Sequence, residues 1–424
     1  MAPLRRGVVL VVTLSVLAAV AVGCSSSSDS AGDSSSSDRS SAKPTTTAAS
    51  GSTTTTAPAA ELFTSGDFYQ VPAALPKGPH GTLIRYQKVT PTIVKGATTW
   101  RIMYTSESVP GKRIAVTGTA LVPDAKVPAS AKGAKRDVLT IAHGTTGIAD
   151  QCAPSKDPGS ELLLLSQPIA NGWLVAQTDY EGLGTPGRHP YLVGESEGRS
   201  VLDAARAASV LPNAHGGTQL GIAGYSQGGH GALWANQIAP TWTPEYHVVG
   251  TFAGAPATEM QVIMRGGPAG FLIMFLAGLK AAHPEVDLAS YLTPAALAKL
   301  DSVDTGCAGE VFSAISGVNP VSLPDAIEKG PWIELADADD PGAVKTADPI
   351  LIIHSEADNV VPIVLSQFLM TRMCKAGNVV ERRVLHDGDN HGQAAVPAYA
   401  QAVPWFEDRF SADPPAPTDG CPAT

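Results

Sequence analysis

A serine in a glycine-rich turn is the residue of this chain best suited to nucleophilic chemistry. The pattern Gly-x-Ser-x-Gly occurs at 194–198 and at 224–228. The second copy follows an apolar run and precedes the helix-like stretch that begins Gly228-Gly229-His230-Gly231. A nucleophile at a strained strand-to-helix turn needs small neighbours so that the backbones can pass. Ser226 is therefore the candidate nucleophile, and the backbone amide of Gln227 is a candidate oxyanion donor.

The first copy of the pattern has less support. Glu195 and Glu197 flank Ser196, and two carboxylates oppose formation of an alkoxide between them. An amphipathic helix without a run of small residues follows, from about Arg199. We therefore do not expect Ser196 to be the nucleophile.

A serine hydroxyl needs a base to take its proton, and the base needs a carboxylate to hold it. In one common chain order, the acid follows the serine at the end of a later strand. The apolar run 350–353 leads to Asp358, which is the preferred acid, with Glu356 as the weaker alternative.

The base should follow the last strand. The run 379–385 leads into a loop with two histidines, His386 and His391. His391 lies deeper in this loop and directly precedes Gly392. We therefore prefer His391 as the base and interpret His386 as structure at the strand end.

A second oxyanion donor is expected after an earlier strand. The apolar run 138–142 leads directly into His143-Gly144-Thr145-Thr146-Gly147. Loops of this kind offer backbone N–H groups to an oxyanion. The amides of Gly144 or Thr145 are the candidates, and His143 is interpreted as a residue that orients the loop.

Strand-like and helix-like stretches alternate from about residue 61 onward, as in buried parallel sheets with helical crossovers. Strands are expected at 82–89, 98–105, 113–122, 138–142, 174–178, 220–224, 248–253, 349–353 and 379–385. Helices are expected at 199–211, 228–238 and 363–375. The pattern predicts an α/β fold with a doubly wound, mostly parallel sheet that begins with antiparallel strands.

The alternation stops between about 257 and 348. Helix-like pieces occur there at 271–279, 294–300 and 309–315, without a strand-like run. An insertion of this size between two sheet strands predicts a helical cap. Its apolar run 271–276 is too short to span a bilayer. This run is expected to form the cap core, or else the wall of an acyl pocket.

Residues 1–23 have the layout of a secretory signal, with two arginines near the start and an apolar run before Cys24. The segment 21–24 resembles the lipobox of bacterial lipoproteins. It predicts that Cys24 is lipidated and anchors an exported protein to the outer face of the cytoplasmic membrane. The alternative is an ordinary cleaved signal and a secreted protein.

A low-complexity segment separates this signal from the folded part. Ser and Thr occupy 20 of the 36 positions from 25 to 60, so little apolar surface is available to offset the entropy of ordering. We expect Cys24 and a disordered tether at 24–60, followed by the folded domain at 61–424.

Charge and motif content exclude several other functions. The 424 residues carry a formal net charge of −10, which argues against nucleic acid as a main partner. No Cys-x-x-Cys or His-Glu-x-x-His pattern occurs, so no metal site is predicted. The segment 182–187 fits the dinucleotide pattern Gly-x-Gly-x-x-Gly, but Pro186 and Pro190 interrupt the helix that such a site requires. No cofactor is predicted.

The exported chain retains four cysteines besides Cys24, and in an oxidising compartment these predict two disulfides. The cysteines are Cys152, Cys307, Cys374 and Cys421. Spacing alone leaves all three possible pairings open.

Five blocks in order resemble the secretory lipase family of α/β hydrolases, which includes fungal secreted lipases and actinobacterial relatives. They are His143–Ala149 with Cys152–Ser155, Asp179–Gly184, Gly224–Gly229, Asp358–Pro362 and His391–Gly392. The likeness extends from about residue 62 to the C-terminus. With the lipobox-like segment, the chain is similar to a lipoprotein-type member of the actinobacterial branch.

The resemblance implies a triad of Ser226, Asp358 and His391 under a helical cap, and hydrolysis of lipid or small acyl esters through an acyl-enzyme. It also implies disulfides between Cys152 and Cys307 and between Cys374 and Cys421. Two alternatives remain open: an acyltransferase that uses the same triad on an envelope acceptor, and a non-catalytic anchored binding module. The sequence predicts neither the preferred acyl chain nor the oligomeric state.

Overall fold

The computed structural model describes residues 60–127, 132–158 and 162–422. The predicted signal at 1–23, the candidate lipidation site Cys24 and the predicted tether up to residue 59 lie outside the described residues.

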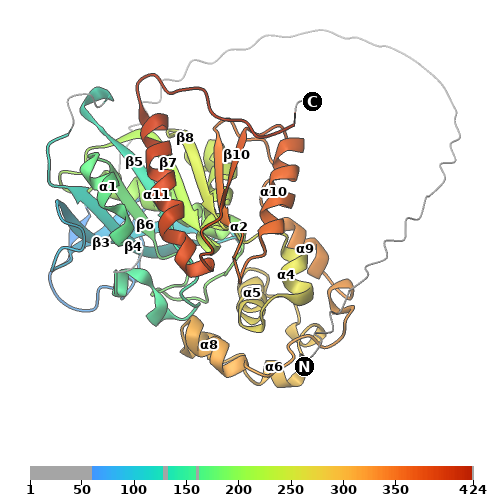
Figure 1. Ribbon diagram of the computed structural model, residues 1–424. Coiled ribbons are helices and arrows are strands. Elements are labelled where there is room, and N and C mark those ends of the chain that lie inside the picture. The colour runs from blue at the N-terminus through green and yellow to red at the C-terminus, as the bar shows by residue number, and fades with distance from the viewer. Residues whose placement is uncertain (1–59, 128–131, 159–161, 423–424) are drawn as a thin grey trace, which may run out of the picture. The chain divides into compact units, whose positions relative to one another are not determined.

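A ten-stranded sheet forms the centre of the described part (Figure 1). Its strands are β1 (Glu61–Leu62), β2 (Leu83–Lys88), β3 (Ala97–Glu107), β4 (Arg113–Pro123), β5 (Arg136–Ala142), β6 (Leu174–Thr178), β7 (Gly216–Tyr225), β8 (His247–Gly254), β9 (Ile350–Ser355) and β10 (Val380–Leu385). Their order is β1-β2-β3-β4-β6-β5-β7-β8-β9-β10. The predicted mostly parallel sheet with an antiparallel start is confirmed, because β2, β3, β4 and β6 pair antiparallel, whereas the strands from β6 to β10 pair parallel.

The central strands are apolar and buried on both faces. All residues of β6 and β9 are buried, which explains the apolar runs at 174–176 and 350–353. Successive side chains of β5 point to opposite faces, so Val138 and Leu139 belong to different core clusters. Helices must therefore cover both faces of the sheet.

The helices outside the cap are α1 (Ser166–Ala170), α2 (Gly194–Ser209), α3 (Gln227–Trp242), α10 (Ile363–Lys375) and α11 (His391–Phe410). Apolar residues of α2 and α3 pack in the cluster that contains Val138. Those of α11 pack in the cluster that contains Leu139, so α11 covers the opposite face (Figure 1). Short 3₁₀ turns occur at Lys132–Ala134, Asp150–Cys152, Pro154–Lys156 and Leu162–Leu165.

The chain between β8 and β9 is helical and contains none of the named strands. Its elements are α4 (Met260–Gly266), α5 (Ala269–Ala282), α6 (Pro294–Leu297), α7 (Ser302–Thr305), α8 (Ala308–Ile315) and α9 (Trp332–Ala338), with 3₁₀ turns at Leu288–Ser290 and Ala326–Glu328. Most of α5 is buried in a separate apolar cluster with the other cap helices. Of the described helices, none has both the length and the apolarity needed to cross a membrane.

Both stems of this insertion are held by one side chain of α10. Arg372 donates to Glu259 Oε1 (2.7 Å) and Thr258 Oγ1 (2.9 Å) at the first stem. It also donates to Asp340 Oδ1 (3.0 Å) at the second stem. The cap therefore leaves the sheet and returns to it at one charged cluster.

Two helix boundaries differ from the expectation. The region of His391 was expected to be a loop, but His391 is the first residue of α11, which Asn390 and Gln393 cap reciprocally. The sequence does not predict α11 because two prolines lie inside it, and proline usually ends a helix. In addition, α2 begins at Gly194 rather than near Arg199, so the first Gly-x-Ser-x-Gly copy forms the first turn of a helix.

Candidate active site

The turn at Ser226 joins β7 to α3 through a strained backbone. Ser226 has φ of 61° and ψ of −120°, an unusual conformation for a residue with a side chain. Gly228 lies so close to the end of the neighbouring strand β5 that a Cβ there would be 1.9 Å from the carbonyl oxygen of Ala142. The small residues of the motif therefore permit the turn, and the turn exposes Ser226 Oγ at the carboxyl end of the sheet.

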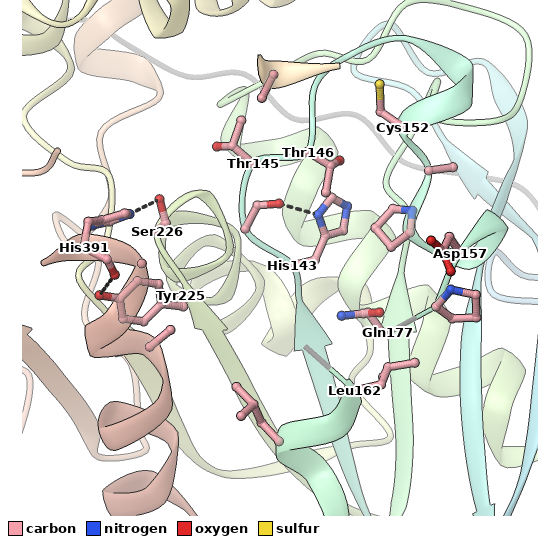
Figure 2. A pocket seen from close by; sticks show the side chains of 18 of the residues that line it. His143, Thr145, Thr146, Cys152, Asp157, Leu162, Gln177, Tyr225, Ser226 and His391 are labelled. Atoms are coloured by element: carbon pink, nitrogen blue, oxygen red, sulfur yellow. Dashed lines mark hydrogen bonds between the residues drawn. The ribbon is translucent and has the colours of Figure 1, made fainter. Parts of the chain in front are cut away.

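Three residues predicted from separate parts of the sequence come together at this turn. His391 Nε2 lies 2.9 Å from Ser226 Oγ, as Figure 2 shows. His391 Nδ1 lies 2.6 Å from Asp358 Oδ2 on the other side of the ring. The three side chains thus form one continuous hydrogen-bonded line, the geometry that activates a serine.

The carboxylate of Asp358 is buried and surrounded by donors. Its Oδ1 accepts the backbone N–H groups of Val360 (2.9 Å) and Val361 (2.8 Å). Its Oδ2 also lies 3.2 Å from Nε2 of His354, a fully buried side chain at the end of β9. Burial raises the pKa of Asp358, but hydrogen bonds from His354 and His391 outweigh it and hold this pKa well below its usual range.

The alternative acid and base lie apart from this line and pair with each other. His386 Nδ1 is 2.8 Å from Glu356 Oε2, and the two side chains are 71% and 51% exposed. The structure does not bring either residue to Ser226. A pair this exposed contributes little to stability.

The predicted oxyanion loop faces Ser226 across a cavity. Gly144, Thr145 and Ser226 all line this cavity. The hydroxyl of Thr145 lies 2.8 Å from that of Tyr191, and His143 Nδ1 lies 2.6 Å from the carbonyl oxygen of Gly144. His143 therefore binds backbone of its own loop, in keeping with an orienting residue.

The cap is fastened to the oxyanion loop. Cys152 and Cys307 form a disulfide, and Ala308 N–H donates to the carbonyl oxygen of Thr146 (2.9 Å). A second disulfide joins Cys374 to Cys421. These pairings are the ones that the family resemblance implies. Because Cys307 belongs to the cap, this disulfide joins the cap covalently to the segment that follows the oxyanion loop.

Two cavities meet at Ser226, and Phe271 of the cap helix α5 lines both. The larger cavity, about 620 Å³, is lined in part by His143, Thr145, Gln151, Asp157, Gln177 and His391. The smaller, about 340 Å³, is lined mostly by apolar residues, among them Leu192, Val262, Ile263, Pro268, Val361 and Leu365. In Figure 2, Ser226 and His391 lie at one end of the larger cavity, and Asp157 and Gln177 lie at the other.

No group of three or more His, Cys, Asp or Glu side chains that can hold a metal ion occurs among the described residues. The side chains that meet at Ser226 are a hydroxyl, an imidazole and a carboxylate.

The sequence of this chain is similar to those of known lipases. The model of the secretory lipase family matches residues 156–323. Lipase A of Moesziomyces aphidis is 27% identical over 239 residues, which cover 52% of this chain and 50% of that protein. Lipase A of Arthroderma benhamiae is 27% identical over 385 residues, which cover 81% of this chain and 78% of that protein.

The fold also has a counterpart among solved structures. Candida antarctica lipase A superposes with a TM-score of 0.67 at 19% identity, over 81% of this chain and 85% of that one. A likeness at this identity establishes the α/β-hydrolase fold. The matched family model and the lipase relatives show that the chain is similar to secretory lipases.

Proposed function

We propose that this protein hydrolyses lipid esters, with Ser226 as the nucleophile, His391 as the base and Asp358 as the carboxylate that orients the base. The observation that carries the proposal is the unbroken line from Ser226 Oγ through the His391 ring to Asp358 Oδ2, with separations of 2.9 and 2.6 Å. A hydrogen-bonded line of this kind lets the hydroxyl lose its proton as it attacks.

The reaction proceeds in two acyl-transfer steps. Ser226 Oγ attacks the ester carbonyl carbon while its proton passes to His391 Nε2, and the carbonyl oxygen becomes an oxyanion. Backbone amides of Gln227 and of Thr145 or Gly144 stabilise that oxyanion. The bond to the alcohol oxygen then breaks, and His391 returns the proton to the departing alcohol. Water, activated by His391, releases the acid from Ser226 in the second step.

The two cavities support an assignment of the two halves of the substrate. The departing alcohol must lie within reach of His391 Nε2, and His391 lines the larger cavity but not the smaller. The alcohol therefore belongs in the larger cavity, where Asp157 can bind hydroxyl groups. The apolar acyl chain belongs in the smaller cavity, where its burial is favourable. The proposed substrate is an apolar acyl ester of a polar, hydroxyl-bearing alcohol.

The proposed location is outside the cytoplasm, which the likeness to secretory lipases and the two disulfides support. The proposed finer location is the outer face of the cytoplasmic membrane, through acylation of Cys24. The lipobox-like residues 21–24 and the Ser- and Thr-rich segment after them support this location. Labelling of cells with a clickable fatty acid should mark the wild-type protein but not Cys24→Ala. An unlabelled wild-type protein in the medium would favour the secreted form.

Hydrolysis of p-nitrophenyl esters of increasing acyl length tests the proposed activity. The wild-type protein should hydrolyse them, with rates that rise as the chain fills the apolar cavity. Ser226→Ala should fold normally and lose activity by about 10⁴-fold or more, since the nucleophile acts as part of a unit. Activity near that of wild type in Ser226→Ala, or no hydrolysis by the wild-type protein at any length, would refute the proposal.

A further inference from the structure

The Gly-x-Ser-x-Gly copy that does not supply the nucleophile forms the first turn of α2, and its second carboxylate points into the protein. The side chain of Glu197 is 0% exposed. A carboxylate is almost never this buried unless other groups bind it. Its partners therefore indicate what it does.

Glu197 joins the start of α2 to the first turn of the nucleophile helix α3. Its Oε1 accepts from the side-chain amide of Gln227 (2.8 Å) and from the backbone N–H of Leu192 (3.0 Å). Its Oε2 lies 2.7 Å from Nδ1 of His230. Both α3 partners lie within four residues of Ser226, so the carboxylate binds directly behind the nucleophile turn.

The side chain of Gln227 is held by a second partner. Its Nε2 lies 2.9 Å from Nε2 of His189, whose Nδ1 lies 2.9 Å from the carbonyl oxygen of Glu181. Burial lowers the pKa of His189 to about 4, so the ring is neutral and its Nε2 accepts. Both N–H groups of the Gln227 amide thus donate, one to His189 and one to Glu197. Rotation of this amide by 180° would place its oxygen against a carboxylate and a ring lone pair.

The other oxygen of the Glu197 carboxylate binds His230, and both ring nitrogens of His230 lie beside acceptor oxygens. His230 is fully buried, with Nδ1 toward Glu197 and Nε2 toward the carbonyl oxygen of Asp339 (2.8 Å). Burial lowers the pKa of His230. The charge of Glu197 and the hydrogen bonds raise this pKa by more than burial lowers it, so the net shift is upward. Removing one member of such a pair leaves an uncompensated buried charge, so Glu197 is held in place by its own ion pair.

Gln227, whose side chain Glu197 binds, directly follows Ser226, the residue with the strained backbone. A conformation such as that of Ser226, with φ of 61°, persists only where the surroundings over-determine it. The amide N–H of Gln227 must also point at the developing oxyanion, and such donors are effective because they do not reorganise during the reaction. Tethering the Gln227 side chain serves both needs.

We propose that Glu197 is a positioning residue for ester hydrolysis, which fixes the oxyanion donor of Gln227 through the Gln227 side chain. The proposal rests on the proposed function of Ser226 and adds a residue that touches neither substrate nor triad. It predicts that loss of the Glu197 carboxylate lowers kcat without raising KM, because the donor acts on the transition state.

The test compares two substitutions of Glu197. Glu197→Gln retains an oxygen for Gln227 and Leu192 and can donate to a neutral His230, so it should keep kcat within about threefold of wild type. Glu197→Met has similar length and no hydrogen bonds, so its kcat should fall by about tenfold or more. The affinity for an alkyl boronic acid, which forms a tetrahedral adduct with the nucleophile, should fall in parallel with kcat. The KM should stay within about twofold.

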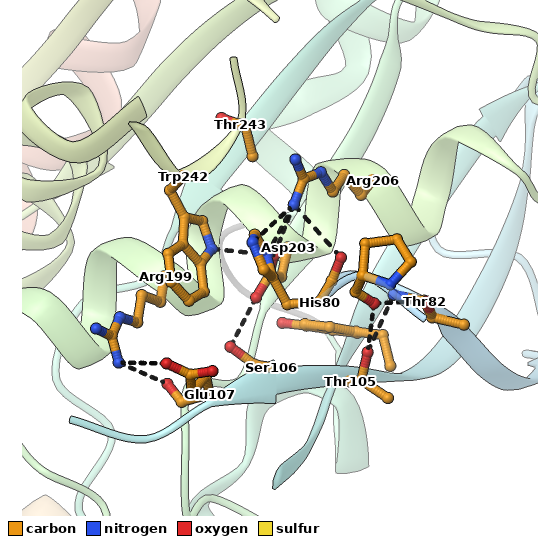
Figure 3. A network of polar contacts seen from close by, with 12 residues as sticks. His80, Thr82, Thr105, Ser106, Glu107, Arg199, Asp203, Arg206, Trp242 and Thr243 are labelled. Atoms are coloured by element: carbon orange, nitrogen blue, oxygen red, sulfur yellow. Dashed lines mark hydrogen bonds and ion pairs between the residues drawn. The ribbon is translucent and has the colours of Figure 1, made fainter. Parts of the chain in front are cut away.

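Asp203 offers a matched control on the same helix. Its buried carboxylate also binds a histidine, His80 (2.5 Å), together with Ser106 (2.7 Å) and Trp242 (3.1 Å), as Figure 3 shows. None of these residues lines either cavity at Ser226. Asp203→Leu should lower the melting temperature as Glu197→Met does, but should leave kcat and boronic acid affinity unchanged.

A second variant keeps the test decisive if Glu197→Met does not fold. Gln227→Met removes the tether at its other end and leaves the Glu197 and His230 pair intact, so it should show the same loss of kcat. Wild-type kcat in whichever of these variants folds would overturn the proposal, as would an equal loss in Asp203→Leu. Either result would leave the proposed activity intact, because that activity is tested by Ser226→Ala.

Discussion

His354 and Asp358 are in contact inside the protein, with His354 Nε2 3.2 Å from the same carboxylate oxygen that binds His391. Both side chains are 0% exposed. His354 Nε2 also lies 3.0 Å from the carbonyl oxygen of Val361, which fixes the ring. The single N–H of His354 Nε2 is therefore shared between Asp358 and the carbonyl oxygen of Val361, and Asp358 lies between two imidazole rings, those of His391 and His354.

This contact predicts that His354 supports the orientation of the triad acid. His354→Met removes the donor and should lower kcat by about tenfold with little change in KM, since hydrogen bonds to charged groups contribute about 1.5–3 kcal/mol. His354→Gln places an amide N–H where Nε2 lies and should restore most of the activity. Steady-state kinetics on one p-nitrophenyl ester provide the measurement.

His386→Gln is the control for these variants, because His386 pairs with Glu356 at the surface. It should have wild-type kinetics. Equal activity of His354→Met and His354→Gln would show that the donor to Asp358 has no role.

The disulfide between Cys152 and Cys307 should matter for activity as well as for stability. The double variant Cys152→Ala, Cys307→Ala should lose about 2–5 kcal/mol of unfolding free energy. It should also lose activity, because the oxyanion loop is then no longer fastened to the cap. The corresponding Cys374→Ala, Cys421→Ala variant should lose stability alone. Denaturant unfolding and kcat measured on both variants test this, and an unchanged kcat without the first disulfide would contradict it.

Phe271 should set how the two cavities are used. Phe271 lines both cavities. Phe271→Ala should merge the two cavities and broaden the range of acyl lengths that are hydrolysed. Phe271→Trp should narrow the junction between the cavities and slow the hydrolysis of long-chain esters most. The measurement is kcat/KM across an acyl series for each variant. Parallel shifts at every length would show that Phe271 does not separate two binding regions.

The stability of the protein should depend on pH through Asp339. Burial raises the pKa of this carboxyl from 3.8 to about 7 in the folded protein. Between these values the folded state holds a proton that the unfolded state has lost, so this contribution to stability is complete below about pH 4 and is lost as the pH rises toward 7.

Asp339→Asn keeps an oxygen for the backbone N–H of Gly194, which Asp339 Oδ1 accepts at 2.9 Å, and cannot ionise. The melting temperature of this variant, relative to wild type, should therefore rise between pH 4 and 7. A constant difference over that range would show that Asp339 does not titrate there.

The sequence predicts the sheet and the tight turn at Ser226 well because both depend on local patterns. Runs such as 350–353 are apolar on both faces, and the glycines around Ser226 satisfy a steric requirement that a strained turn imposes. The site residues at the carboxyl ends of β7, β9 and β10 meet because parallel strands end at the same edge of a sheet.

Other features depend on contacts between distant segments and carry no local signal. The helix α11 contains Pro397 and Pro404, so sequence rules end it or omit it, whereas packing of Tyr399 and Phe406 on the sheet stabilises it. In the sequence, Glu197 only argues against Ser196 as a nucleophile. Its contacts with Gln227 and His230 depend on how α2 packs against α3, and no local pattern predicts them. The contact of His354 with Asp358 likewise requires the loop after β9 to fold back.

Covalent labelling with an alkyl fluorophosphonate tests the central assignment most directly. The reagent reacts with serine hydroxyls that an adjacent base activates, so peptide mass spectrometry of the labelled protein should find one stoichiometric adduct, on Ser226. Ser226→Ala and His391→Ala should remain unlabelled. An adduct on another serine, such as Ser196, or an unlabelled wild-type protein that is folded, would contradict the assignment.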